Sequence, residues 1–172
     1  RTNIEIPETQ RDLLKALLKT GKPVVVVLFT GRPLSLTWEH ENIPAILNVW
    51  FGGSEAGDAI ADVLFGDVNP SGKLSATFPQ NVGQVPIYYA HKNTGRPLRG
   101  EWFQKFQSNY LDVSNEPLYP FGYGLSYSTF EYGDLKLDKP EMNTSDSITV
   151  SIEVTNTGSR DGAEVIQLYI RD

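Results

Sequence analysis

The chain has 172 residues, of which 40% are apolar and 21% charged, a balance typical of globular proteins. Fifteen lysine and arginine residues against 21 aspartate and glutamate residues give a net charge of −6, which argues against a nucleic-acid partner because binding to phosphate backbones needs positive charge. The absence of cysteine excludes disulfides, thiolate nucleophiles and cysteine-ligated zinc.

No segment of the sequence is expected to span a membrane. The longest unbroken apolar run, residues 24–29, is far shorter than the ~20 residues that cross a bilayer. The first residues carry neither an initiator methionine nor a charged-then-apolar leader. We therefore expect the sequence to be a fragment of a longer protein, with any export signal removed or outside it.

The first elements predicted along the chain are a helix and a buried strand. Residues 8–20 place four leucines on one face and basic side chains on the other, the pattern of an amphipathic helix. Gly21 is expected to end this helix in the left-handed conformation. Residues 23–29 are aliphatic without polar alternation, which is typical of a strand buried on both faces of a parallel sheet.

Three further elements complete an α/β pattern. Residues 43–50 resemble a second short buried strand entered through a proline, and residues 54–65 have helical spacing of apolar side chains. Residues 73–78 are expected to add another strand after an Asn-Pro-Ser-Gly turn. The order of these elements predicts an α/β fold with a mostly parallel sheet and right-handed crossovers.

The second half of the chain has a different character. Residues 80–116 lack periodicity, which favours a functional or covering loop, and residues 120–127 are rich in glycine and aromatic side chains, as in an extended segment held by ring packing. Residues 131–147 are predicted to form a linker. Residues 148–155 alternate apolar and polar side chains as a half-buried strand does, and residues 165–170 are predicted to form another. These are too few strands for a β-sandwich, which needs about seven.

The segment Gly52–Gly57 invites comparison with the nucleophile elbow of serine hydrolases. Ser54 stands between a predicted strand and a predicted helix, but Ala56 occupies a position where that motif needs glycine. A triad would also require His91, the only downstream histidine. The favoured interpretation makes Ser54 a helix N-cap and the glycines a tight turn. A serine hydrolase is kept as an alternative.

Carboxylates gather in the predicted helix 54–65. Glu55, Asp58 and Asp62 lie within two turns, and a metal or general-acid role is conceivable for them. We favour a solvated helix face, because charged side chains are mostly exposed. No metal site and no cofactor are predicted.

The loop over residues 88–97 carries the candidate binding residues. Two tyrosines stand beside histidine, lysine, asparagine and arginine, the combination that a sugar face and its hydroxyl groups require. We predict that His91 and Arg96 bind substrate as hydrogen-bond donors. Plain packing of the loop is the alternative interpretation.

Six motifs in order carry a resemblance to a known family. They are residues 21–28 (GKPVVVVL), 31–34 (GRPL), 50–57 (WFGGSEAG), 61–66 (ADVLFG), 69–74 (NPSGKL) and 119–127 (YPFGYGLSY). Together they resemble the C-terminal α/β sandwich domain of glycoside hydrolase family 3, the β-glucosidase family. The tail from Ile148 is similar to the opening strands of the fibronectin-type-III-like module found in many members.

The resemblance implies a fold and a domain organisation. Residues 1–130 would form a three-layer α/β sandwich, lacking its first part, around a partial and mostly parallel sheet. Residues 131–147 would link it to residues 148–172, the truncated start of the β module.

The resemblance also implies a retaining β-glucosidase that acts on terminal, non-reducing β-D-glucosides. Such enzymes use two carboxylates about 5–5.5 Å apart. In the family, the aspartate nucleophile lies in an N-terminal barrel, and the glutamate acid/base lies on a loop ahead of the helix that begins here near Pro7. Residues 1–4 match the stretch just after that loop. No residue of this chain is therefore expected to be catalytic, including the nearby Glu5 and Glu8.

Three expectations concern partners and location. A non-catalytic carbohydrate-binding or scaffold module is the alternative to a glycosidase fragment. The missing barrel would leave apolar surface and a strand edge exposed, so self-association of the fragment is predicted. The family resemblance favours a bacterial periplasmic or secreted protein.

Overall fold

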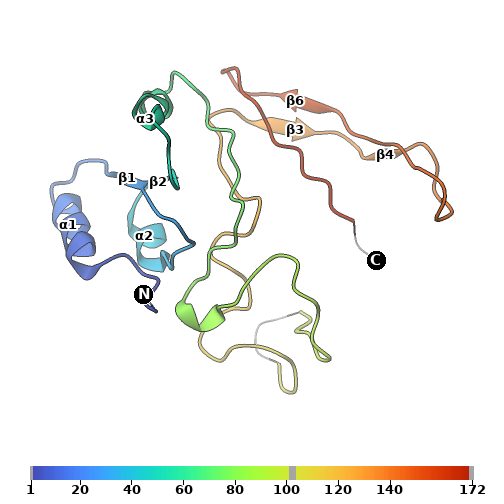
Figure 1. Ribbon diagram of the computed structural model, residues 1–172, viewed down its shortest axis with the longest axis horizontal. Coiled ribbons are helices and arrows are strands. Elements are labelled where there is room, and N and C mark those ends of the chain that lie inside the picture. The colour runs from blue at the N-terminus through green and yellow to red at the C-terminus, as the bar shows by residue number, and fades with distance from the viewer. Residues whose placement is uncertain (1, 101–103, 171–172) are drawn as a thin grey trace. The chain divides into compact units, whose positions relative to one another are not determined.

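The computed structural model describes residues 2–100 and 104–170 (Figure 1). Arg1 and residues 171–172, which are the outermost residues of the predicted domains, lie outside the described part. The chain divides into two compact units, one built from residues up to 57 together with 73–123, the other from residues 58–72 together with those from 124 onward.

A parallel pair of strands lies at the centre of the first unit. β1 (Val25–Leu28) pairs with β2 (Ala45–Asn48), in register from Val25 opposite Ala45 to Leu28 opposite Asn48. The backbone N–H of Val49 donates to the carbonyl of Leu28 at 3.0 Å and continues the ladder. The predicted parallel pairing of the aliphatic run with its downstream neighbour is confirmed.

Helix α1 (Glu8–Leu18) also follows the sequence prediction, ending two residues earlier than expected. Gly21 has φ +69°, the left-handed conformation that glycine adopts at no steric cost. Only part of the leucine face is covered. Leu14 packs against the core, whereas Leu13 and Leu17 are exposed.

A second helix, α2 (Thr37–Asn42), was not predicted. Its six residues are mostly polar and too few to show a helical period. A tertiary contact holds it to α1, because Arg11 Nε donates to Glu39 Oε1 at 2.9 Å and Glu39 is fully buried. The Arg11 and Lys15 side chains also lie 5.8 Å from the centre of the Trp38 ring.

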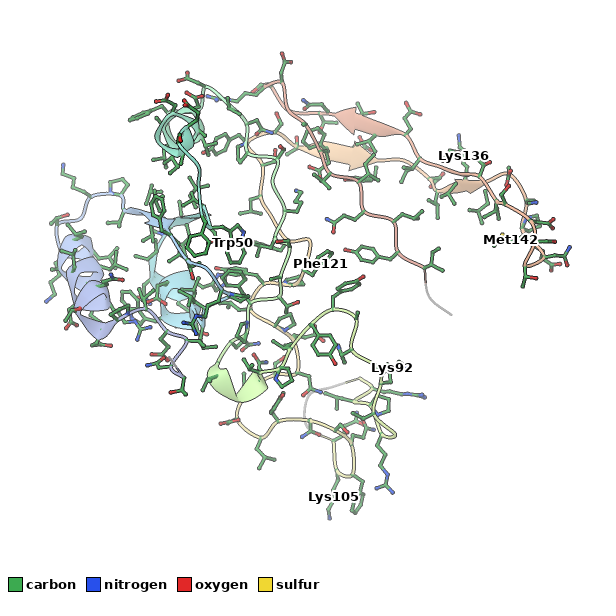
Figure 2. The ribbon with its side chains drawn as sticks, in the orientation of Figure 1. Trp50, Lys92, Lys105, Phe121, Lys136 and Met142 are labelled. Atoms are coloured by element: carbon green, nitrogen blue, oxygen red, sulfur yellow. The ribbon has the colours of Figure 1, made fainter. Side chains whose placement is uncertain are left out.

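The core of the first unit is small. Its buried apolar residues are Ile6, Leu28, Leu36 and Phe78. Partly buried side chains packed against them are Leu14, Val26, Leu34, Ile46, Trp50, Leu74, Leu118 and Tyr119. Trp50, labelled in Figure 2, has its ring centre 5.7 Å from that of Phe78. This cluster joins the strands, α1, the residue Leu36 just before α2, and the segments 74–78 and 118–123.

The prediction of a sheet strand over residues 73–78 is wrong. These residues are extended, but they pair with residues 118–123 through separate backbone bonds rather than with β1 or β2. Leu74 N–H donates to Tyr123 O at 2.8 Å, and Phe78 N–H donates to Tyr119 O at 2.8 Å. Pro120 between these points has no N–H, so a continuous ladder cannot form there.

The expectation that the aliphatic run is buried on both faces is also not met. Val25 is half-exposed and Phe29 is 64% exposed. Within the described residues, β1 has one neighbouring strand, so its other edge and much of one face have no covering layer. The α/β type is as predicted, with a two-stranded parallel sheet in the part of the chain that the structure describes.

Helix α3 (Ala56–Phe65) begins two residues later than predicted and ends at Gly66, which has φ +84°. Arg160 Nη1 donates to the carbonyl of Gly66 at 2.6 Å. A cation at this place also suits the negative end of the helix dipole. The second unit therefore attaches its loop around Arg160 to the end of α3.

The β strands of the second unit form two short antiparallel pairs. β3 (Phe130–Tyr132) pairs with β6 (Val154–Asn156), and β4 (Lys136–Leu137) pairs with β5 (Val150–Ser151). Residues 131–147, expected to be a linker, thus contain strand residues and the turn of this hairpin, which Figure 1 shows in orange and red. The predicted strand over 148–155 is present as β5 and β6.

The last predicted strand, residues 165–170, is absent. These residues have no ladder partner among those the structure describes, and Ile166, Leu168 and Ile170 are all more than half exposed. Apolar side chains alone therefore do not make this segment a strand, because a strand also needs a neighbouring strand for its backbone hydrogen bonds. No helix in the described residues has the length and apolar character needed to cross a bilayer.

Candidate functional site

The candidate residue His91 closes a tight turn in the long loop of the first unit. Its backbone N–H donates to the carbonyl of Tyr88 at 3.3 Å, and its ring atom Nδ1 lies 2.9 Å from the same oxygen. The Tyr88 ring stands edge-on to the imidazole, with the two ring centres 6.2 Å apart and the planes at 88°. The side chain of His91 is therefore held by the turn it belongs to.

Tyr89 anchors this turn to the aromatic segment that follows the loop. Its ring stacks on Phe121, with ring centres 4.6 Å apart and an angle of 21° between the planes. Phe121 is labelled in Figure 2. Tyr88 and Tyr89 remain 53% and 60% exposed. Ring packing therefore holds Phe121 in the predicted segment 120–127, whereas Tyr88 and Tyr89 still face solvent in part.

The second candidate, Arg96, lies on a different part of the loop. Its carbonyl accepts a hydrogen bond from Ser108 N–H at 2.7 Å, and Thr94 Oγ1 donates to Ser108 Oγ at 2.8 Å. Within residues 2–100 and 104–170 the guanidinium makes no ion pair, and it forms no hydrogen bond with His91. The structure fixes the backbone at Arg96 but does not bring the two candidate side chains into contact.

A buried glutamine, not singled out from the sequence, holds the base of the loop. Gln84 lies in the short 3-10 helix η1 (Val82–Gln84) and is 1% exposed. Its Nε2 donates to the carbonyls of Ser114 and Glu116 at 2.8 and 3.1 Å, and its Oε1 accepts from Gln80 N–H at 2.6 Å. One side chain thus joins both ends of residues 80–116. No local pattern marks this glutamine, because the two carbonyls that its Nε2 binds are 30 and 32 residues away.

The arrangement required of a serine hydrolase is not formed. His91 Nδ1 is bound to a backbone carbonyl, whereas a triad needs a carboxylate there. Among the described residues, Ser54 has no hydrogen bond to a histidine. Gly52 packs so closely on Ala56 that a Cβ at this position would overlap the alanine side chain. The glycine pair is therefore explained by packing at the start of α3.

The acidic residues near the start of the chain are engaged in ion pairs. Arg11 Nη1 lies 3.4 Å from Glu5 and 3.5 Å from Glu8, and Lys15 Nζ lies 2.9 Å from Glu8. The hydrogen bond to Glu39 raises the pKa of Arg11 further above its usual value. In the described part of the chain, no three histidine, aspartate or glutamate side chains gather as a metal site would need.

One aromatic residue connects the core to α2. Tyr119 Oη lies 2.9 Å from His40 Nδ1, and its ring stacks on Tyr123 with centres 5.1 Å apart. Burial, followed by the nearby Tyr123 and Glu39, raises the pKa of Tyr119. The phenol therefore stays neutral over the physiological range and remains available as a hydrogen-bond donor. Its role is to fix the 118–123 segment on which Tyr89 is anchored.

A comparison with known protein families shows which family this chain belongs to. The profile described as the glycosyl hydrolase family 3 C-terminal domain matches residues 1–127. The chain belongs to this family. The match covers the parallel pair, all three helices, the loop and the aromatic segment, and it ends just before β3.

Relatives of this family 3 domain include glycosidases of two kinds. The chain is 59% identical to a protein named periplasmic β-glucosidase from Salmonella typhimurium. The aligned 172 residues are all of this chain and 22% of that protein. It is 49% identical to a β-xylosidase from Formosa agariphila, of which it spans 23%. The chain thus covers less than a quarter of these relatives' length.

Solved structures of family 3 proteins share the fold. The β-glucosidase of Listeria innocua in complex with gluconolactone matches 92% of this chain and 22% of its own, with a TM-score of 0.87 and 48% identity. A D270A mutant of the Listeria innocua enzyme, in complex with laminaribiose, matches with a TM-score of 0.85 and 46% identity. The described architecture is therefore that of the corresponding part of these enzymes.

Proposed function

We propose that this chain is part of a retaining β-glucosidase that hydrolyses terminal, non-reducing β-D-glucosides, and that both catalytic carboxylates lie in the rest of the protein. The observation that carries the proposal is the 59% identity, over the whole chain, to a periplasmic β-glucosidase. The ion pairs of Glu5 and Glu8 are consistent with structural roles for both carboxylates. No cofactor is needed for such a reaction.

The sugar is the part of this proposal most open to test. A β-xylosidase is a relative at 49% identity, so a xyloside is the competing substrate. In the full-length protein, we expect kcat/KM for a nitrophenyl β-glucoside to exceed that for the matching β-xyloside at least tenfold. A preference for the xyloside would contradict the assignment of the sugar and leave the glycosidase assignment intact.

The isolated chain is proposed to be inactive. A retaining glycosidase needs two carboxylates about 5–5.5 Å apart on opposite sides of the scissile bond. Purified chain should therefore release no nitrophenol from the glucoside above the buffer rate. Turnover that survives purification would contradict this. The alternative, a non-catalytic carbohydrate-binding or scaffold module, predicts that the isolated chain binds laminaribiose in a calorimetric titration.

The proposed domains follow the family pattern. Residues 1–130 are proposed to be part of a three-layer α/β sandwich whose remaining strands come from the rest of the protein. The antiparallel pairs β3–β6 and β4–β5 support a fibronectin-type-III-like module that includes residues 148–172 and extends back to Phe130. Completion of both layers would cover the exposed face and edge of β1.

The loop 88–97 is proposed to contact substrate through His91 and Arg96. Exposed tyrosine rings, an exposed imidazole and an exposed guanidinium stand on a loop whose base Gln84 holds. In the full-length enzyme, His91→Ala and Arg96→Ala should raise KM for longer glucosides, those with a sugar beyond the terminal glucose, with little change in kcat. Lys139→Ala, on a partly exposed residue of the second unit, is the matched control. Unchanged KM in both loop variants would reject the role.

Two further proposals concern the state of the chain. The exposed apolar side chains, including Phe29, Phe51 and Ile170, support self-association of the isolated chain. Light scattering should give a mass above 19.2 kDa that falls on dilution. A constant monomer mass would contradict the proposal. For the whole protein, a periplasmic or secreted location is proposed from the relative named periplasmic β-glucosidase.

A further inference from the structure

The imidazole of His91 is fixed in one hydrogen-bonding state by its own turn. Its Nδ1 lies 2.9 Å from the carbonyl oxygen of Tyr88. A carbonyl oxygen can only accept, so the hydrogen of this bond is carried by Nδ1. A neutral imidazole has a single N–H, and its other nitrogen, Nε2, therefore presents a lone pair. The edge-on ring of Tyr88 holds the orientation of the imidazole.

The accepting atom of His91 is available to a ligand. The side chain is exposed, and within residues 2–100 and 104–170 its Nε2 receives no hydrogen bond from the protein. Solvent water supplies the hydrogen bond to this exposed acceptor in the free chain, and a ligand hydroxyl can take the place of that water. A sugar hydroxyl is such a donor, because its O–H can donate while its oxygen accepts from another group.

Because the loop is proposed to contact longer glucosides, we infer that His91 recognises a hydroxyl group of a sugar beyond the terminal glucose by accepting its hydrogen bond at Nε2. This inference rests on the proposed function of the loop and adds that the sugar hydroxyl donates the hydrogen bond and His91 accepts it. It replaces the sequence-based expectation that His91 acts as a donor. Arg96, whose guanidinium can only donate, is complementary. A substrate in which this O–H is replaced by a group that cannot donate should therefore bind less tightly at His91.

The test uses the full-length enzyme and modified disaccharides. The probes are methyl β-laminaribioside and congeners whose reducing-end 2-, 4- or 6-hydroxyl is replaced by hydrogen or by fluorine. Fluorine accepts a hydrogen bond weakly and cannot donate one, so the fluoro congeners distinguish a hydroxyl that donates to the protein from one that accepts. At one position, both the deoxy and the fluoro congener should raise KM about 3–10-fold, the range of one neutral hydrogen bond.

Variants of His91 complete the experiment. In His91→Ala the parent compound should show the raised KM, and the penalty for the deoxy and fluoro congeners should disappear. His91→Gln keeps an acceptor that reaches the Nε2 position and should retain the preference for the hydroxyl. His91→Lys offers only donors and should lose it. Lys139→Ala again serves as the control.

The outcomes distinguish this inference from the proposed function. A fluoro congener that binds as well as the hydroxyl compound, while the deoxy congener binds poorly, would show that the hydroxyl accepts and would overturn the inference alone. A raised KM in His91→Ala without sensitivity at any of the three hydroxyls would do the same. An unchanged KM for the parent compound in His91→Ala would overturn both the inference and the proposed role of His91 in the loop.

Discussion

Two apolar segments that are both predicted to be strands differ in the structure: one is a paired strand and the other is unpaired. The sequence predicts strands over residues 23–29 and over residues 165–170. The first forms β1, paired with β2 and packed on the core through Val26 and Leu28. The second has no ladder partner in the described chain, and Ile170 is 92% exposed.

The difference shows that a neighbour, more than an apolar pattern, makes a strand. Fixing one residue's backbone costs about 1–2 kcal/mol, which ladder hydrogen bonds and burial must offset. β1 obtains both from β2 and from the core residue Phe78. Residues 165–170 obtain neither within the described residues. Four substitutions test how far partners and burial stabilise these segments, and urea unfolding of the chain measures the effect of each.

The largest effect is expected for Phe78→Ala. Phe78 is 1% exposed, contacts Trp50 and Tyr119, and joins the 74–78 segment to the β1–β2 pair. Removing a buried phenylalanine side chain leaves a cavity and costs about 3–5 kcal/mol. Unfolding should lose its cooperativity or shift to much lower urea. A loss below about 1 kcal/mol would mean that this cluster does not hold the first unit together.

A smaller loss is expected for Glu39→Ala. This change leaves the mostly buried Arg11 without its partner at 2.9 Å and disconnects α2 from α1. Loss of a buried charge-assisted hydrogen bond costs about 2 kcal/mol. Glu8→Ala is the matched control, because Glu8 is largely exposed and its pairs with Arg11 and Lys15 are on the surface. Equal losses in the two variants would contradict a special role for the buried pair.

Gly66→Ala should cost about 1 kcal/mol, the penalty of a side chain in the left-handed region. Gly66 has φ +84°, and a Cβ there would also overlap the guanidinium of Arg160, which must then shift. Gly53→Ala is the control, because a Cβ at Gly53 meets no atom within 4 Å and its φ is not positive. A neutral Gly66→Ala would show that the contact with Arg160 does not stabilise the second unit.

The smallest effect is expected for Ile166→Ser in the unpaired run. Ile166 is 55% exposed, so the change should stay within about 0.5 kcal/mol. Val26→Ser, on the core face of β1, is the matched substitution and should destabilise clearly. Equal losses of stability in the two variants would mean that residues 165–170 are packed in solution, as β1 is, and would contradict the difference between the two segments.

The sequence determined the elements whose signals are local. The leucine spacing of residues 8–18 and the glycine at position 21 place α1, because helical period and capping act within a few residues. The aliphatic run and its downstream neighbour predict a parallel pair, and the six ordered motifs identify family 3. The loop 88–97 could be singled out because its residue types alone indicate sugar chemistry.

Only the tertiary structure decided the rest. The polar helix α2 exists because Glu39 is buried against Arg11, and residues 74–78 pair with 118–123 instead of joining the sheet. The hydrogen-bonding state of His91 depends on which atom its ring meets, here the carbonyl of Tyr88. Such contacts depend on packing between distant segments or on the exact path of a turn. A local pattern of residue types therefore does not predict an individual contact of this kind.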